Sequence, residues 1–141
     1  MPTWPACFSA ALYREHLAGY PRGAVGDRRQ PQAGQESPRV DRVPRATVWI
    51  SAATIWEIAI KHGLGRGDMP VSAPDALRYF QQSGYRFLPV EPEHAAAVGE
   101  LASHHADPFD RILVAQAIVE PMRLITHDPI VARYSDTIIE V

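Results

Sequence analysis

Short apolar runs alternate with longer amphipathic segments from Thr47 to the end of the chain, and this alternation restricts the fold more than any other feature. We expect strands at 47–50, 85–90, 123–126 and 137–141, and helices at 52–63, 72–83, 92–101, 107–120 and 128–134. Parallel strands with helices on both faces are the natural packing for this order. The sequence therefore predicts an α/β domain with no internal repeat.

The first 46 residues have a different texture. They contain six prolines, four glycines and seven arginines without strand or helix periodicity, so we expect residues 1–46 to be poorly ordered. Residues 47–141 are expected to form the single domain. One short amphipathic helix is conceivable near the start, with its apolar face built from Trp4, Phe8, Leu12, Tyr13 and Leu17.

The charge is unevenly divided. The whole chain carries a net charge of -2, but residues 1–46 hold seven arginines against four acids, and residues 47–141 hold seven basic residues against twelve acids. The acidic domain does not resemble a general phosphate-binding surface, although an acidic site that holds a cation can still accept nucleic acid.

The single cysteine and the short apolar runs limit the compartment and the chemistry. Cys7 stands alone, so an intramolecular disulfide and a thiolate zinc cluster are both excluded. No apolar run approaches the roughly 20 residues of a membrane span. We expect a soluble, cytoplasmic protein.

The helix expected at 52–63 presents five apolar residues on one face, which should face the core. That face consists of Ala52, Ile55, Trp56, Ala59 and Ile60.

Carboxylates occupy positions where an α/β fold can gather them. Asp107 and Asp110 stand at the start of one predicted helix, Asp128 follows a predicted strand, and Glu57 lies in an earlier helix. Hard divalent cations prefer oxygen ligands, so three acids from distant parts of the chain suggest a magnesium-type site for phosphate chemistry.

Each acid also has a purely structural interpretation. Glu57 precedes Lys61 by four residues and can form an ion pair on the helix surface. Asp107 and Asp110 can cap the first turn of a helix and complement its dipole, and Asp128 before Pro129 can do the same.

The histidines suggest zinc, but only weakly. They match neither a His-Glu-x-x-His pattern nor a Cys/His ribbon, so solvated or packing roles are expected for His94, His104, His105 and His127.

Three motifs in a fixed order resemble a known family. The segments WISAATIWEIAIKHGLG, FLPVEPEHAAAVGELASHHADPFDRILVAQAI and LITHDPIVARY closely resemble PIN-domain ribonuclease toxins of the VapC type, which belong to toxin-antitoxin pairs. The resemblance extends from about Val48 to Val141. It implies a three-layer α/β/α fold with a mainly parallel sheet.

The resemblance also implies an activity and partners. Glu57, Asp110 and Asp128 match the family's metal-binding acids, and Asp107 stands close enough in the sequence to contribute. The implied cofactor is Mg²⁺ or Mn²⁺, the substrate is RNA, and the partners are a cognate antitoxin and a second copy in a homodimer.

The chain departs from the family pattern at its beginning. Family members start with a central apolar strand that ends in an Asp-Thr-His-like motif, whereas Asp27 and Asp41 lie in Arg/Pro/Gly-rich surroundings. We expect the first central strand to be absent or replaced, and a frameshift or wrong start is one hypothesis for residues 1–46. Two functions follow: a metal-dependent endoribonuclease toxin, or an impaired remnant that at most binds the antitoxin.

Overall fold

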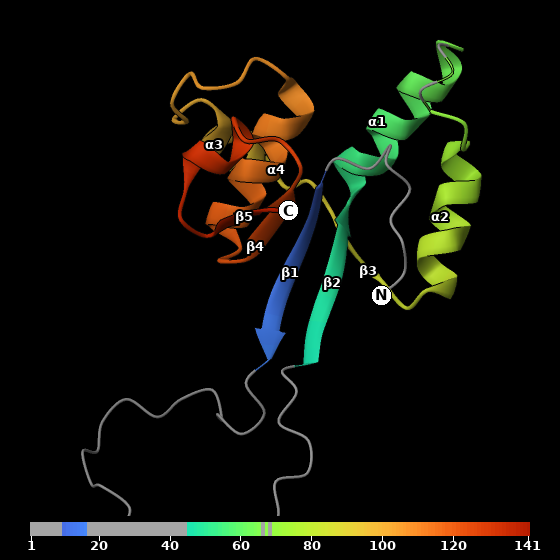
Figure 1. Cartoon of the computed structure of the whole chain (residues 1–141), viewed down its shortest axis with the longest axis horizontal. Helices are drawn as coiled ribbons and strands as arrows, with labels where there is room; N and C mark the ends of the chain where they lie inside the picture. The colour runs from blue at the N-terminus through green and yellow to red at the C-terminus, as the bar shows by residue number, and fades with distance from the viewer. Residues whose placement is uncertain (1–9, 17–44, 66, 68) are drawn as a thin grey trace, which may run out of the picture.

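The computed structural model describes residues 10–16, 45–65, 67 and 69–141 (Figure 1). The elements in chain order are β1 (Ala10–His16), β2 (Arg45–Ser51), α1 (Ala52–Gly63), α2 (Ala73–Gln82), β3 (Arg86–Leu88), α3 (Pro92–Val98), α4 (Pro108–Val119), β4 (Arg123–Thr126), the 3-10 helix η1 (Val131–Tyr134) and β5 (Ile138–Glu140).

The five strands form one sheet in the order β3-β2-β1-β4-β5. β2 runs parallel to β3, β4 runs parallel to β5, and β1 is antiparallel to both of its neighbours. Four strands therefore point the same way, and their carboxyl ends meet at one edge of the sheet. The mainly parallel sheet expected from the sequence is confirmed.

The centre of the sheet is occupied by β1, whose direction is reversed. Leu12 lies opposite Trp49 on β2 and opposite Leu124 on β4, and it is fully buried. A strand at this position pairs with the edges of both β2 and β4, whereas a local helix would leave those two edges without partners. The amphipathic helix expected through Leu12 and Tyr13 is therefore wrong for Ala10–His16. Its other members, Trp4, Phe8 and Leu17, lie outside the described residues.

Because β1 is reversed, its amino end lies at the edge where the other strands finish. Ala10 pairs with Thr126, the last residue of β4, whereas Glu15 pairs with Ala46 near the opposite edge. Within the described part of the chain, β1 thus brings no carboxylate to the carboxyl edge. Asp27 and Asp41 lie outside the described residues.

Two separate cores cover the two faces of the sheet. Neighbouring strand residues point to opposite faces, and the pairs Trp49/Ile50 and Phe87/Leu88 divide accordingly between the two clusters. One cluster joins the sheet to α4 and η1, and the other joins it to α1 and α2. The result is the expected three-layer α/β/α arrangement, with α1 and α2 on one side of the sheet in Figure 1 and α3 and α4 on the other.

The orientation of α1 differs from the prediction. Its buried residues are Ala53, Thr54, Glu57 and Ile58, while Trp56 remains 63% exposed and Ile60 39% exposed. The expected apolar face therefore points largely away from the core. Apolar periodicity shows that a helix has an apolar stripe, but the neighbouring elements decide which face they cover.

Helix starts follow the sequence signals closely. Ser51, Ser72 and Asp107 cap α1, α2 and α4, and each accepts a backbone N–H with its side chain. The end of α3 is earlier than expected, at Val98. None of the described helices is long and apolar enough to cross a membrane.

Candidate metal centre

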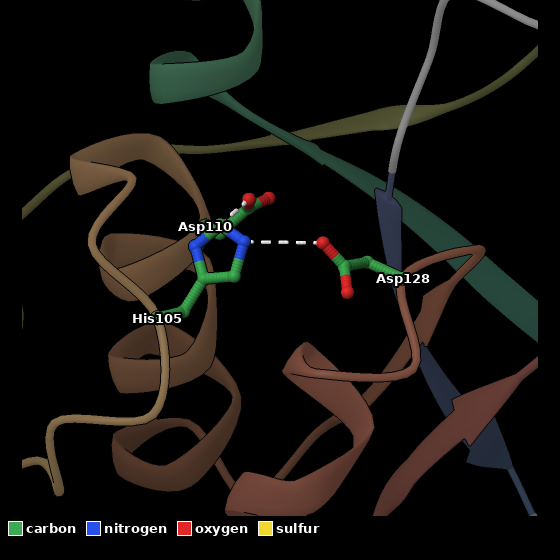
Figure 2. Close-up of side chains that lie close together, drawn as sticks. All are labelled: His105, Asp110 and Asp128. Carbon is green, nitrogen blue, oxygen red and sulfur yellow. Dashed lines mark hydrogen bonds and ion pairs between the residues drawn. The ribbon is translucent and has the colours of Figure 1, made fainter.

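The candidate site lies at the carboxyl edge of the sheet, where three segments meet. Asp110 comes from the first turn of α4, His105 from the loop between α3 and α4, and Asp128 from the loop that follows β4 (Figure 2). These residues are distant in the sequence but close in space, because parallel strands bring the loops after their carboxyl ends to a common edge of the sheet.

The three side chains face one another closely. His105 Nε2 lies 3.1 Å from Asp128 Oδ2, and His105 Nδ1 lies 3.5 Å from Asp110 Oδ2 (Figure 2). One potential ligand atom from each residue lies within 4.8 Å of the other two. Two ligands on opposite sides of one Mg²⁺ are about 4.2 Å apart, so small side-chain shifts bring this set around one ion.

The hydrogen bonds of His105 define its tautomer. The backbone N–H of Asp107 donates to Nδ1 at 3.1 Å, so Nδ1 carries no proton in the neutral ring. Nε2 then carries the proton and donates to Asp128 Oδ2. The ring therefore orients the Asp128 carboxylate and fills the space between the two aspartates.

The Asp-Pro-Phe-Asp sequence places Asp110 through ordinary helix capping. Asp107 Oδ1 accepts the backbone N–H of Phe109 at 2.8 Å and that of Asp110 at 3.4 Å, while Pro108 opens the first turn. The capping interpretation of Asp107 is confirmed. With the first-turn amides satisfied by Asp107, the Asp110 carboxylate is left to face the site.

The pKa of Asp110 is raised to about 6. Burial is the largest cause, and the negative charge of Asp107 adds to it. The neighbouring His105 lowers the pKa, while Glu57 and Asp128 raise it further. Three other acids therefore make ionisation of Asp110 less favourable. The Asp110 side chain is 14% exposed.

The two carboxylate oxygens of Asp128 have different partners, one in its own loop and one in the candidate site. Oδ1 accepts the backbone N–H of Ile130 at 2.7 Å, and Oδ2 faces His105. The Ile130 hydrogen bond is the main reason that the pKa of Asp128 lies below its ordinary value. This carboxylate stays ionised beside Asp110.

Glu57 lies next to the three-residue cluster rather than inside it. It is 7% exposed, and Lys61 Nζ donates to its Oε1 at 2.5 Å. The ion pair expected from the four-residue spacing is confirmed. The Glu57 hydrogen bond is the main reason that the pKa of Lys61 is raised, and Asp107 and Asp110 also raise it.

The loop that carries His105 is held by two side chains from outside it. The Arg111 guanidinium donates to the backbone oxygens of Val98, Ala102 and His105, and to the Tyr134 hydroxyl. The Tyr134 hydroxyl in turn accepts the backbone N–H of His105 at 2.9 Å. These contacts fix the backbone that presents the imidazole.

The fold therefore brings together Asp110 and Asp128 and adds His105, which the sequence interpretation had assigned to solvation or packing. The available signal was the position of His105 two residues before the Asp107 cap. That signal was weak, because a loop histidine acquires its neighbours only from the tertiary fold.

His94, by contrast, is 1% exposed and packs between α3 and α4, with its Nε2 2.9 Å from Glu120 Oε1.

The donor set suits a hard divalent cation. Two carboxylates supply negative charge and oxygen atoms. The imidazole supplies a nitrogen ligand, which Mn²⁺ tolerates better than Mg²⁺ does, only if it gives up one of its two hydrogen bonds. The negative charges of Glu57 and Asp107 act on the same site, since both raise the pKa of Asp110.

A comparison with protein families identifies the family of the chain. The model of the PIN domain family matches residues 24–136, which is more than half of the chain, and the chain therefore belongs to the PIN domain family. PIN domains are in general nucleases that depend on divalent metal ions and act on RNA. No curated protein and no solved structure gives a significant match.

Proposed function

We propose that this PIN-domain protein is a metal-dependent endoribonuclease toxin of the VapC type, acting in the cytoplasm and restrained by a cognate antitoxin. The observation that carries the proposal is the meeting of Asp110, Asp128 and His105 at one edge of the sheet, within 4.8 Å of one another. This edge is where α/β proteins commonly place their ligands.

The acidic residues would contribute to metal binding in two ways. Asp110 and Asp128 would hold the cation directly, with Glu57 and Asp107 acting through water or charge. A bound Mg²⁺ or Mn²⁺ supplies a water of lowered pKa and neutralises charge on the phosphate. His105 would keep Asp128 oriented through its Nε2–H. The protein needs no covalent nucleophile for this hydrolysis.

An apolar groove beside the acidic site supports the antitoxin proposal. Its volume is about 530 Å³, and it lies between α1, α3 and α4, lined by Ala52, Ala53, Trp56, Val90, Ala95, Val98, Pro108, Phe109 and Ile112. The side chains that line the groove carry no positive charge to bind RNA phosphates. They suit the apolar face of a protein segment, such as an antitoxin helix.

The groove adjoins the catalytic edge through the first turn of α4. Phe109, which packs edge-to-face against Trp56 with ring centroids 5.1 Å apart, directly precedes Asp110. A protein segment seated in the groove would therefore lie beside the acidic cluster and block RNA. This is a direct physical route to inhibition.

RNA cleavage with matched acid variants tests the nuclease. The full-length protein should cleave RNA with Mn²⁺ or Mg²⁺ and stop in EDTA, while Asp110→Asn and Asp128→Asn should each lose roughly 100-fold or more of the rate. Asp136→Asn, an exposed acid in the loop before β5, is the control and should retain activity. Cleavage that survives EDTA or both substitutions would disprove the assignment.

One observation favours the second candidate, an impaired remnant that only binds the antitoxin. In the described residues, the central strand β1 presents Ala10 at the site edge, where family members carry an aspartate. A remnant would bind Mn²⁺ weakly in calorimetry and would not cleave RNA with either metal. Measurable cleavage that depends on Asp110 excludes it.

A further inference from the structure

Glu57 and Lys61 form an ion pair whose two members differ in exposure. The Glu57 side chain is 9% exposed and that of Lys61 is 39% exposed, with Nζ and Oε1 2.5 Å apart. An exposed pair of this spacing contributes little. A carboxylate as buried as Glu57, however, needs a positive partner, because an unpaired buried charge is strongly unfavourable.

The Lys61 ammonium is also electrostatically coupled to the acidic site. Besides the hydrogen bond to Glu57, the charges of Asp107 and Asp110 raise its pKa. The ammonium therefore keeps its proton throughout the physiological range and lies in the field of three acids.

Two other basic side chains next to the site, those of Arg111 and His105, already have other partners. The Arg111 guanidinium is committed to backbone oxygens and to Tyr134. Both ring nitrogens of His105 already have partners, the backbone N–H of Asp107 and the Asp128 carboxylate. Among the described residues at this edge, Lys61 is the cation that can balance the acids.

We propose that Lys61 is the resident counter-cation of Glu57, that a divalent ion entering the site displaces it, and that the released ammonium then binds an RNA phosphate. This inference rests on the proposed metal-dependent function and names a residue that changes partner within it. The ammonium stays charged throughout, so the exchange is one of ion pairs and requires no proton transfer.

The exchange predicts tighter metal binding when Lys61 is neutralised. Lys61→Met removes the competitor for Glu57 and a positive charge near the ion, so Mn²⁺ affinity measured by calorimetry should rise about tenfold. A lysine that only stabilised the fold would do the opposite, since loosening α1 would weaken the site. Lys61→Gln serves the same purpose if Lys61→Met does not fold.

Thermal unfolding provides a second readout that does not involve activity. Without metal, Lys61→Met should unfold at a lower temperature, because Glu57 loses its partner. Saturating Mn²⁺ should then raise the midpoint more in this variant than in the wild type. Lys61→Arg, which keeps the charge, should behave like the wild type in both measurements.

Arg78→Met is the matched control. Arg78 forms a similar helical ion pair with Asp75 at 2.9 Å on α2, but both side chains are about two thirds exposed. Its loss should leave the Mn²⁺ affinity and the metal-induced shift unchanged. A comparable effect of Arg78→Met would mean that general charge, rather than the Glu57 contact, causes the change.

RNA binding tests the second half of the exchange. With Ca²⁺ in place of the reactive metal, Lys61→Met should bind RNA several-fold more weakly than the wild type, and Arg78→Met should not. Unchanged RNA affinity would overturn the phosphate contact. Unchanged or weaker Mn²⁺ affinity in Lys61→Met would overturn the displacement.

The failure of this inference can be distinguished from failure of the proposed function. If the wild type binds Mn²⁺ and cleaves RNA but Lys61→Met binds Mn²⁺ no more tightly, only the displacement is wrong. If the wild type binds no divalent ion and Asp110→Asn changes nothing, both the metal-dependent function and the displacement are wrong.

Discussion

The guanidinium of Arg111 and the hydroxyl of Tyr134 lie 3.1 Å apart, and both groups bind the backbone of His105. Arg111 starts from α4 and Tyr134 from η1, so two elements on either side of the loop hold it in place. The imidazole next to Asp110 and Asp128 is therefore positioned by residues that do not belong to the acidic cluster.

Arg111→Met should destabilise the fold by about 2–4 kcal/mol, because three backbone oxygens, two of them in part-buried contacts, lose their donor at once. Urea unfolding followed by circular dichroism measures the change. Arg133→Met, an exposed arginine on η1, is the matched control and should cost less than about 0.5 kcal/mol. Equal effects of the two substitutions would show that the Arg111 contacts contribute nothing specific.

Asp110 should make the metal-free protein less stable as the pH rises. Its pKa is about 6 in the folded protein against an ordinary value of 3.8, so the folded state binds the proton more tightly. The stability associated with the protonated form is fully present below pH 3.8 and is lost as the pH rises through 6.

Asp110→Asn isolates this contribution. In EDTA, the difference in unfolding free energy between Asp110→Asn and the wild type should grow in favour of the variant from about pH 4 to pH 6 and stay constant above that. Denaturant titrations at several pH values measure it. A difference that does not vary with pH would show that Asp110 titrates normally.

His94 should be a major structural residue despite its titratable ring. Nδ1 accepts the backbone N–H of Glu91 at 3.0 Å, and Nε2 donates to Glu120 Oε1, so the ring joins the start of α3 to the end of α4. His94→Ala should cost about 2–4 kcal/mol through lost hydrogen bonds and a cavity. His94→Gln, which can keep one of the bonds, should cost less in the same unfolding assay.

Leu12 tests the central position of β1. Because its side chain is fully buried against β2, β4 and α4, Leu12→Ala should lower the unfolding free energy by about 2–5 kcal/mol. Leu64→Ala provides the comparison, since Leu64 is 57% exposed at the end of α1 and should have little effect. If Leu12→Ala is as mild as Leu64→Ala, β1 does not occupy the sheet centre in solution.

The local signals of the sequence were sufficient for much of the fold. Ser51, Ser72 and Asp107 mark helix starts by their own capping chemistry, which depends only on residues within the next turn. The family motifs likewise lie in continuous segments. For this reason the α/β class, most of the elements after Thr47 and the PIN family could all be predicted.

Three features depended on contacts between distant segments. β1 became a reversed central strand because two strand edges were available to it, and α1 turned Trp56 outward because α2 and the sheet covered the opposite face. His105 joined Asp110 and Asp128 because the loops of three elements end at one edge. The sequence by itself determined which segments after Thr47 form helices and strands, since those preferences are local. Only the tertiary structure decided the direction of β1, the buried face of α1 and the members of the acidic site. Each of these depends on which distant groups lie next to it.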